Sequence, residues 1–578
     1  PPRYLFAISL TGICLDLIET RQLWSFVFSV IANHTLYSST ELNKLTKDEI
    51  YDAFYTDLEF GTGGLRGIMG VGTNRMNEIV IRKATLGFGN YLLNKVDNCK
   101  EKGVVIAHDN RHNSEFFTQV AANTLSSLGI KVYVFDDLRP TPELSFAIRY
   151  LHASGGIVIT ASHNPKEYNG YKIYNSDGCQ LILEQSSQVE EEINKINNEL
   201  DLDLIPNQNL IKVLDKELDE RYYEMVLNCS INEVDANDLK IVYTPQHGTG
   251  YVPVKTVLNR LNYQLIEVKE QCFPNPDFIN TISPNPEEKD AYVLAIKYLK
   301  EHNADIILTT DPDCDRVGVV ILKNNQPVYL TGNQTGSLLI NYILKYRQEK
   351  GLLAKNSIIY NTIVTSPLGA KIANKYNVKC EQTLTGFKYI GDKIQKSIEN
   401  NGPVFQMGYE ESYGYLLNSS VRDKDGVQSV MMIAEMAAFY KKQNKDLVDV
   451  FEELQQEFGY HIESQYSLKV QGEAGLKKIA QLMNNYRVKP FKKIADDEVV
   501  VIEDYLTLNK YFDNKIIKLD YEKSNVLRFI FNDGSFVAIR PSGTEPKCKF
   551  YFAVCGKTYQ EAKTRHEKVR NFIFEGLK

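Results

Sequence analysis

Short apolar runs that end in polar loops recur along the chain. Each run predicts a buried strand, and stretches between them, such as residues 116–128 and 290–300, carry apolar residues at helical spacing. The runs are residues 104–107, 156–159, 241–243, 306–308, 358–360 and 404–405. Alternating strands and helices predict α/β domains with mostly parallel sheets, whose strand ends present the polar loops.

The last part of the chain has a different pattern. Residues 526–531 and 535–539 are apolar runs joined by Asn-Asp-Gly, which is typical of a hairpin turn. A smaller α+β domain is therefore expected at the C-terminus. Polar stretches set the predicted limits: α/β domains over 46–215, 216–327 and 328–456, and the α+β domain over 457–578.

Composition narrows the class of protein. The 578 residues are 43% hydrophobic and 24% charged, as in an ordinary globular protein. The net charge of −7 gives no basis for binding nucleic acid or an anionic membrane, so an anionic substrate needs positive charge gathered locally. Nine cysteines without a Cys-x-x-Cys pair indicate neither a disulfide framework nor a zinc site, and they favour a cytoplasmic protein.

Residues 1–45 differ from the rest of the chain. Residues 23–40 carry no charge and are moderately apolar, but Asp16, Glu19 and Arg21 interrupt the apolar run before them. No transmembrane span is therefore expected. The segment begins with Pro rather than Met, so we expect a truncated or processed terminus, and we assign it no role.

The loop 160–165 (TASHNP) directly follows the predicted strand at 156–159. Its serine, Ser162, lies where doubly wound proteins place their chemistry. A hydrolase nucleophile elbow needs glycines where Thr160 and Asn164 stand, so a hydrolase triad is not expected. Either Ser162 carries a group during catalysis, or its loop makes only turn hydrogen bonds.

Asp311, Asp313 and Asp315 alternate in the loop after the run at 306–308. At this spacing the carboxylates share one side of an extended segment and can converge on a hard cation. A calcium-binding EF-hand needs glycine and glutamate where Arg316 and Leu322 stand, so Mg²⁺ in a phosphate site is preferred. The alternative is a solvated acidic turn, in which the carboxylates repel unless a cation or Arg316 compensates them.

Two further loops carry groups suited to a sugar phosphate. Residues 540–547 (RPSGTEPK) combine Arg540 with hydroxyls and a glycine, which suit a phosphate, and the alternative is an ordinary Pro/Gly turn. Residues 408–414 (GYEESYG) offer acceptors for sugar hydroxyls, or they are simply solvated. A Walker motif and a dinucleotide motif are both incomplete, because Tyr551 and Arg66 replace required glycines.

Taken in this order, the motifs resemble the α-D-phosphohexomutase superfamily, specifically its phosphoglucomutase/phosphomannomutase enzymes of the longer bacterial type. The likeness covers residues 52–574. It implies four domains, three of related α/β fold with mixed or parallel sheets and a fourth of α+β fold. It also implies one Mg²⁺ per chain, with glucose 1,6-bisphosphate as activator and intermediate.

The resemblance implies a role for each motif residue. Ser162 matches the phosphoserine, whose phosphoryl oxygen completes a Mg²⁺ site made by Asp311, Asp313 and Asp315. The implied catalytic residues are Ser162, His163, Lys172, Lys388 and Arg66. The implied substrate-binding residues are Glu410, Ser412, Thr385, Gly386, Arg316, Arg540, Ser542, Gly543 and Thr544.

Lys388 is the expected general base, with His163 second, because nearby cations would lower a lysine pKa toward the working range. A mobile fourth domain holding Arg540 would let a bisphosphate intermediate turn over. Two positions depart from the family pattern. Gly63 stands where many relatives have serine, and Tyr409 where many have glycine, so both bear on sugar preference.

The expected function is interconversion of glucose 1-phosphate and glucose 6-phosphate, with small hexose phosphates as partners and a monomer or homodimer as the assembly. Phosphomannomutase and phosphopentomutase activities are alternatives, because the sugar loop 408–414 is the least diagnostic motif. A protein that binds sugar phosphates without catalysis is disfavoured, because Ser162 and the three aspartates are intact.

Overall fold

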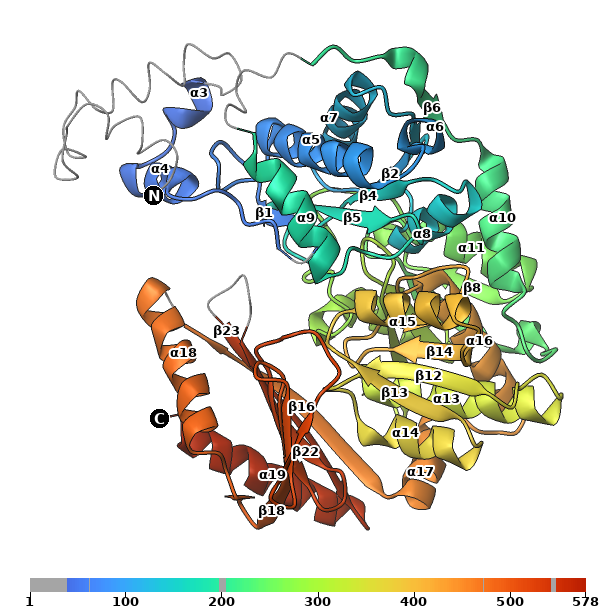
Figure 1. Cartoon of the computed structure of the whole chain (residues 1–578). Coiled ribbons are helices and arrows are strands. Elements are labelled where there is room, and N and C mark those ends of the chain that lie inside the picture. The colour runs from blue at the N-terminus through green and yellow to red at the C-terminus, as the bar shows by residue number, and fades with distance from the viewer. Residues whose placement is uncertain (1–38, 62, 197–203, 471, 542–546, 578) are drawn as a thin grey trace.

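The computed structural model describes residues 39–61, 63–196, 204–470, 472–541 and 547–577. In these residues, four sheets with their own helices follow one another along the chain (Figure 1). We call the units built on these sheets domains 1 to 4. Within the same ranges, no helix combines the length and the apolar character needed to cross a membrane.

Domain 1 has a mixed sheet in the order β1-β5-β4-β2-β3-β6. The neighbouring strands β4, β2, β3 and β6 are parallel, while β5 and β1 add antiparallel at the edge next to β4. Its strands are β1 (Gly64–Ile68), β2 (Val104–His108), β3 (Val132–Val134), β4 (Gly155–Ile159), β5 (Tyr168–Asn175) and β6 (Ile211–Val213). Its helices are α3 (Ser39–Leu42), α4 (Lys47–Phe54), α5 (Glu78–Lys95), α6 (Cys99–Lys102), α7 (Ser114–Ser127), α8 (Thr141–Tyr150) and α9 (Leu183–Asn194). Because helices cover both faces, β2 and β4 are continuous apolar runs.

Domain 2 repeats this plan with the order β11-β10-β9-β7-β8. β9, β7 and β8 are parallel, and β10 and β11 extend the sheet antiparallel. The strands are β7 (Lys240–Thr244), β8 (Gln264–Glu267), β9 (Ile306–Thr310), β10 (Val317–Lys323) and β11 (Gln326–Leu330). The helices are α10 (Lys216–Leu227), α11 (Tyr251–Arg260) and α12 (Val293–Glu301).

Domain 3 has the order β13-β12-β14-β15, with only β15 antiparallel to its neighbour. The strands are β12 (Ser357–Thr362), β13 (Lys379–Thr383), β14 (Val404–Tyr409) and β15 (Tyr415–Leu416). The helices are α13 (Gly332–Glu349), α14 (Pro367–Lys375), α15 (Phe387–Glu399), α16 (Gly426–Lys441) and α17 (Leu447–Phe458). Domains 2 and 3 share one apolar core, in which α11 packs against α16.

Domain 4 differs from the others, as the sequence predicts. Its antiparallel sheet has the order β16-β23-β22-β21-β18-β19-β20, and β17 pairs with β18. The strands are β16 (Tyr460–Lys469), β17 (Lys493–Ile494), β18 (Asp497–Asp504), β19 (Asn509–Phe512), β20 (Lys515–Lys518), β21 (Leu527–Phe531), β22 (Phe536–Pro541) and β23 (Lys547–Gly556). The helices are α18 (Gly472–Val488) and α19 (Tyr559–Glu575).

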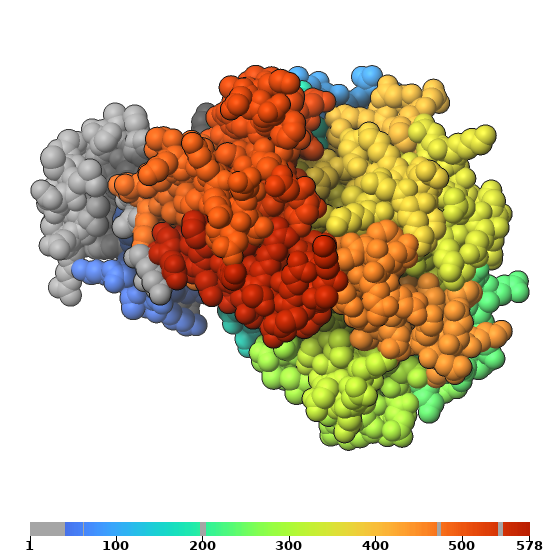
Figure 2. Space-filling view, turned by 90° about the horizontal axis from the view of Figure 1, so that it is seen from below, coloured from blue at the N-terminus to red at the C-terminus, as the bar shows by residue number. Residues whose placement is uncertain are grey.

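Domain 4 packs against domain 3. Ile363, Val364 and Leu384 of domain 3 join the apolar cluster on one face of the domain 4 sheet. The Arg528 guanidinium also donates to Gln382 Oε1 at 2.9 Å. Figure 2 shows the orange and red surface of domain 4 beside the yellow surface of domain 3. Domains 3 and 4 are therefore joined by a shared apolar cluster and by this hydrogen bond.

Candidate active site

Ser162 lies in the loop after β4, in an unusual backbone conformation. Its φ angle is +53°, in the left-handed region that residues other than glycine rarely adopt, and the residue is only 3% exposed. The hydroxyl donates to Asp311 Oδ2 at 2.8 Å, and the N–H donates to Thr160 Oγ1 at 2.8 Å. The proposed nucleophile of domain 1 therefore lies directly against the aspartate loop of domain 2.

Arg111, a residue that our sequence reasoning missed, holds the backbone of the Ser162 loop. Its buried guanidinium donates to carbonyl oxygens along this loop. The acceptors are the carbonyls of Ser162 at 2.5 Å, Asn164 at 2.6 Å, Pro165 at 2.8 Å and Tyr168 at 3.0 Å. The ring of Phe278, from domain 2, lies 5.3 Å from the guanidinium carbon. Arg111 follows a predicted strand, but its place in the sequence does not indicate which loop it contacts.

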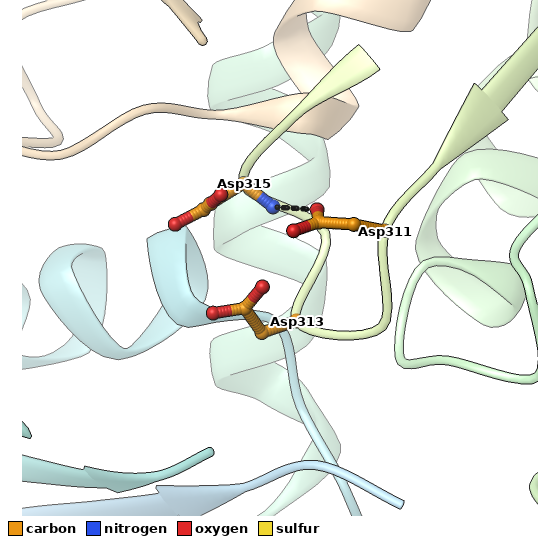
Figure 3. Close-up of side chains that lie close together, drawn as sticks. All are labelled: Asp311, Asp313 and Asp315. Atoms are coloured by element: carbon orange, nitrogen blue, oxygen red, sulfur yellow. Dashed lines mark hydrogen bonds between the residues drawn. The ribbon is translucent and has the colours of Figure 1, made fainter. Parts of the chain in front are cut away.

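The carboxylates of Asp311, Asp313 and Asp315 converge in the loop after β9 (Figure 3). One oxygen from each lies within 4.8 Å of the others, and all three residues are buried. Asp311 Oδ1 accepts the backbone N–H groups of Asp315 at 3.1 Å and Arg316 at 3.0 Å. Oδ1 of Asp313 and Oδ1 of Asp315 have no hydrogen-bond partner among the described residues. Unpaired buried carboxylate oxygens on a hard-donor cluster fit a divalent cation.

The pKa shifts of the three aspartates also fit a bound cation. Burial, together with repulsion from the neighbouring carboxylates, raises the pKa of Asp311 well above its usual value and raises the pKa of Asp315 as well. Burial also acts on Asp313, but the ammonium of Lys172, a hydrogen bond with Asp311 and the charge of Lys424 together outweigh it and hold the pKa of Asp313 below its usual value. A bound cation would relieve this repulsion between buried charges.

Two lysines flank the aspartate loop. Lys172 Nζ of β5 lies 2.9 Å from Asp313 Oδ2. Lys424 Nζ lies 3.0 Å from Asp315 Oδ2 and 3.0 Å from Asp423 Oδ1. Sequence reasoning missed Lys424, although the charged run 422–425 just before α16 was a usable signal. The two ammonium groups place positive charge from domains 1 and 3 on an acidic loop of domain 2.

His163 and Arg66 lie beside Ser162. His163 Nδ1 is 3.2 Å from Ser162 Oγ, and an Arg66 guanidinium nitrogen donates to Asn164 Oδ1 at 3.1 Å. Burial, followed by the positive charges of Arg316 and Arg66, lowers the pKa of His163 well below its usual value. A neutral imidazole therefore faces the serine hydroxyl at pH 7.

Glu410 connects the two predicted sugar-binding segments. Its Oε1 accepts the Gly386 N–H at 3.1 Å, and its Oε2 accepts the Ser412 hydroxyl at 3.4 Å. Thr385 precedes Gly386 in the same loop, and the φ of Gly386 is +116°. Burial raises the pKa of Glu410 to about 7, although Lys424 opposes the shift.

Arg316 joins the aspartate loop 311–315 to the loop 408–414. It pairs with Gly414 in an isolated β-bridge, and its guanidinium forms an ion pair with Glu287. Arg540 is half-buried on β22, opposite Lys549 of β23. The other predicted phosphate-loop residues, Ser542, Gly543 and Thr544, lie outside the described residues.

Lys388, the predicted general base, lies at the start of α15. Its ammonium donates to the Leu181 carbonyl of domain 1 at 3.4 Å. The pKa of Lys388 is lowered to about 8, as a base requires, but burial causes the shift. Our expectation that neighbouring cations would lower it is wrong, since the charges that act on it, such as Glu522, are negative and raise its pKa.

Of the two departures from the family pattern, Tyr409 is the last residue of β14, and its side chain packs in the core of domain 3. Its ring is fully buried between α13 and α14, where an added Cβ at Gly336 or Gly369 would collide with it. Its hydroxyl lies 3.4 Å from the Asn361 side-chain nitrogen. Gly63 has a φ of +103° beside β1. The Tyr409 side chain is therefore part of the core of domain 3.

Domain models of a known family match the chain in the order of its four sheets. They are phosphoglucomutase/phosphomannomutase alpha/beta/alpha domain I at residues 57–200, domain II at 220–324, domain III at 331–458, and the C-terminal domain at 473–571. The chain belongs to the phosphoglucomutase/phosphomannomutase family. It is therefore an enzyme of the mutase type that transfers a phosphoryl group, and the predicted four-domain architecture of this family is confirmed.

Curated relatives match nearly the whole chain. The phosphoglucomutase of Staphylococcus haemolyticus is 39% identical over 528 residues, which are 90% of this chain and 94% of the relative. The phosphoglucomutase of Staphylococcus epidermidis strain ATCC 12228 is 39% identical over 521 residues, 89% and 93% of the two chains.

Solved structures share the fold. A putative phosphomannomutase from Thermus thermophilus has a TM-score of 0.67 at 21% identity, with 90% of this chain and 99% of that chain covered. The phosphoglucomutase parafusin from Paramecium has a TM-score of 0.63 at 20% identity, with 90% and 94% covered. At these identities the likeness shows the fold alone.

Proposed function

We propose that this family member is a phosphoglucomutase that interconverts α-D-glucose 1-phosphate and glucose 6-phosphate. The observation that carries the proposal is the hydroxyl of Ser162, which donates to Asp311 inside a buried cluster of three aspartates. A serine held in this way suits phosphoryl transfer better than acyl transfer, because it faces three carboxylates that could hold a cation. The relatives named phosphoglucomutase at 39% identity support glucose as the sugar.

The three aspartates would hold one Mg²⁺ per chain, with an oxygen of phosphorylated Ser162 as a further ligand. The unpaired Oδ1 atoms of Asp313 and Asp315 support this assignment. When bound, the cation would neutralise charge that develops on the transferring phosphoryl group. Lys172, Lys424 and Arg316 would share that task from the protein side.

The proposed reaction is a reversible transfer of a phosphoryl group between Ser162 and the sugar. The P–O bond to Ser162 Oγ breaks as a bond forms from phosphorus to a sugar hydroxyl oxygen, and the hydroxyl proton goes to a base. The product is glucose 1,6-bisphosphate, which turns over and returns its other phosphoryl group to Ser162. Lys388 remains the proposed base because its pKa of about 8 lies near neutral pH. His163, whose Nδ1 is 3.2 Å from Ser162 Oγ, is the proposed group that moves the serine proton, and Lys172, which pairs with Asp313, is a second candidate.

Substrate recognition is proposed at two places. Glu410, Ser412, Thr385 and Gly386 would contact the sugar hydroxyls, since Glu410 already links the loops that carry them. Arg540 and residues 542–544 would bind the phosphate that is not transferred, and Arg66 would lie beside the phosphoserine. Three further points stay predictions: the domain limits at 215, 327 and 456, a cytoplasmic location, and a monomeric or dimeric assembly.

Turnover measured side by side on glucose, mannose and ribose 1-phosphates, with and without Mg²⁺, tests the proposal. Each assay includes the matching bisphosphate, and intact mass reports phosphate on Ser162. We expect the highest kcat/KM on glucose 1-phosphate and loss of activity without Mg²⁺. Equal or better turnover of mannose or ribose 1-phosphate would reassign the sugar, and no turnover of any of them would reject a mutase.

A further inference from the structure

Strand β5 of domain 1 carries two side chains that contact different domains. Lys172 and Tyr174 are two positions apart and therefore lie on the same face of the strand. Lys172 pairs with Asp313 of domain 2, whereas the Tyr174 hydroxyl donates to Asp423 Oδ2 of domain 3 at 2.7 Å. Tyr174 and Asp423 are 0% and 3% exposed, so water cannot easily replace this hydrogen bond.

The other oxygen of Asp423 is used by the next residue. Asp423 Oδ1 accepts the backbone N–H of Lys424 at 2.8 Å and its ammonium at 3.0 Å. The same ammonium lies 3.0 Å from Asp315 Oδ2 in the metal loop. A continuous series of contacts thus runs from Tyr174 through Asp423 and Lys424 to Asp315, and it joins domains 1, 3 and 2.

The stem of Lys424 has little freedom. A Cβ added at Gly414 would lie 2.1 Å from Lys424 Cδ, so the lysine lies directly on the backbone at the end of the sugar loop. The Phe387 ring centroid is 5.6 Å from the ammonium. The stem is therefore placed by Gly414, and the direction of the ammonium is set by Asp423 and Asp315.

We propose that Tyr174 and Asp423 are a positioning pair that directs the Lys424 ammonium toward the phosphoryl group during transfer. The phenol suits this role because it orients the Asp423 carboxylate without neutralising it, which leaves the negative charge for Lys424. Among the described residues, neither member of the pair forms a hydrogen bond or ion pair with Asp311, Asp313 or Asp315. The inference rests on the proposed function, because it assigns Lys424 to the transition state of that reaction.

The chain offers a matched control for Tyr174. Tyr222 is also fully buried, and its hydroxyl donates to Asp425 Oδ1 at 2.9 Å, in the same segment of domain 3. Asp425 caps the N-terminus of α16 through the N–H groups of Val427 and Gln428, and among the described residues its carboxylate forms no hydrogen bond or ion pair with the Lys424 ammonium. Removing either phenol hydroxyl therefore deletes one buried hydrogen bond to a carboxylate. Only the hydrogen bond from Tyr174 reaches the carboxylate that orients Lys424.

The test compares Tyr174→Phe, Tyr222→Phe and Asp423→Asn with the unaltered chain under saturating Mg²⁺ and glucose 1,6-bisphosphate. We expect both phenylalanine variants to lose similar thermal stability. Of these two variants, only Tyr174→Phe should lose about tenfold in kcat, with KM for glucose 1-phosphate within twofold of the unaltered value. Asp423→Asn should lose more in kcat than Tyr174→Phe, because it also removes the charge. Equal kcat in the two phenylalanine variants would overturn the proposal.

A crystal structure of Tyr174→Phe provides a readout that does not depend on turnover. We expect the Lys424 ammonium to move beyond 4 Å from Asp315, and an unchanged contact would overturn the pairing. The turnover of Ser162→Ala distinguishes a failure of the proposed function from a failure of the positioning pair. If Ser162→Ala keeps full activity, the proposed function fails, and the crystal structure alone then decides whether Tyr174 and Asp423 position Lys424.

Discussion

The Ser162 hydroxyl lies 2.8 Å from Asp311 Oδ2, although the two residues are 149 positions apart in the sequence. Both residues follow central parallel strands, β4 in domain 1 and β9 in domain 2, at the carboxyl ends where α/β proteins place ligands. The loop that carries Ser162 in domain 1 therefore lies against the loop that carries Asp311 in domain 2. A phosphoryl group on Ser162 would sit within reach of the aspartate cluster without any rearrangement of either sheet.

Replacement of Ser162 by alanine should abolish mutase turnover, because no other hydroxyl in the described part of the chain donates to Asp311. We expect kcat to fall by more than about a thousandfold, while binding of glucose 1-phosphate persists. Coupled assays and calorimetry measure the two quantities. Ser176→Ala, in the exposed turn after β5, is the control and should be fully active. Undiminished turnover in Ser162→Ala would remove the central claim.

Addition of Mg²⁺ should stabilise the protein, because it relieves repulsion in the buried aspartate cluster. At a hundredfold excess over Kd the gain is about 2.7 kcal/mol, which raises Tm by several degrees. Asp315→Asn should lose most of this rise, whereas Asp496→Asn, on domain 4, should keep it. Thermal unfolding with Mg²⁺ and with a chelator checks the prediction, and an equal rise in both variants would contradict it.

The strands that lead to the site loops could be predicted from the sequence because their apolar runs are local signals. The runs at 157–159 and 306–308 became β4 and β9, and the predicted hairpin became β21 and β22. The contact between Lys424 and Asp315 could not be predicted in this way. It depends on the packing of domain 3 on domain 2, in which α16 lies on α11, and no local pattern encodes that packing.

The raised pKa of Glu410 predicts a pH dependence for stability. The folded pKa of about 7 exceeds the unfolded value near 4.5, so burial favours the protonated carboxyl. Stability attributable to this group is complete below pH 4.5 and is lost as pH rises through 7. Glu410→Gln should therefore be stabilised relative to the unaltered chain at pH 8, by up to about 3 kcal/mol, and not at pH 4.5. Denaturant unfolding at both pH values measures the difference, and a gain of the same size at pH 4.5 would contradict the assignment.

Substitution of Tyr409 should affect stability and leave the choice of sugar unchanged, because its ring lies in the core between α13 and α14. Tyr409→Phe loses only a 3.4 Å contact with Asn361, so we expect about 1 kcal/mol or less in unfolding free energy. The ratio of kcat/KM for glucose and mannose 1-phosphates should stay within twofold. Ser412→Ala, in the sugar loop, is the comparison and should change that ratio. A shifted ratio in Tyr409→Phe would return Tyr409 to the sugar site.

Arg111→Lys should lower both stability and catalysis, even though it keeps the positive charge. A lysine has a single ammonium and cannot replace a fork that bonds several carbonyls of the Ser162 loop. We expect a loss of about 2 to 4 kcal/mol in unfolding free energy and a lower fraction of phosphorylated Ser162 at fixed bisphosphate concentration.

Arg111→Lys should lower phosphorylation through the backbone of Ser162, because the φ of +53° persists only while the surroundings impose it. Once the carbonyl at Ser162 is released, the residue can relax and turn its hydroxyl away from Asp311. Arg260→Lys, at an exposed ion pair with Glu220, is the matched control and should leave phosphorylation unchanged. If Arg111→Lys loses stability but reaches the same fraction of phosphorylated Ser162 as the control, Arg111 supports the fold without positioning the Ser162 hydroxyl.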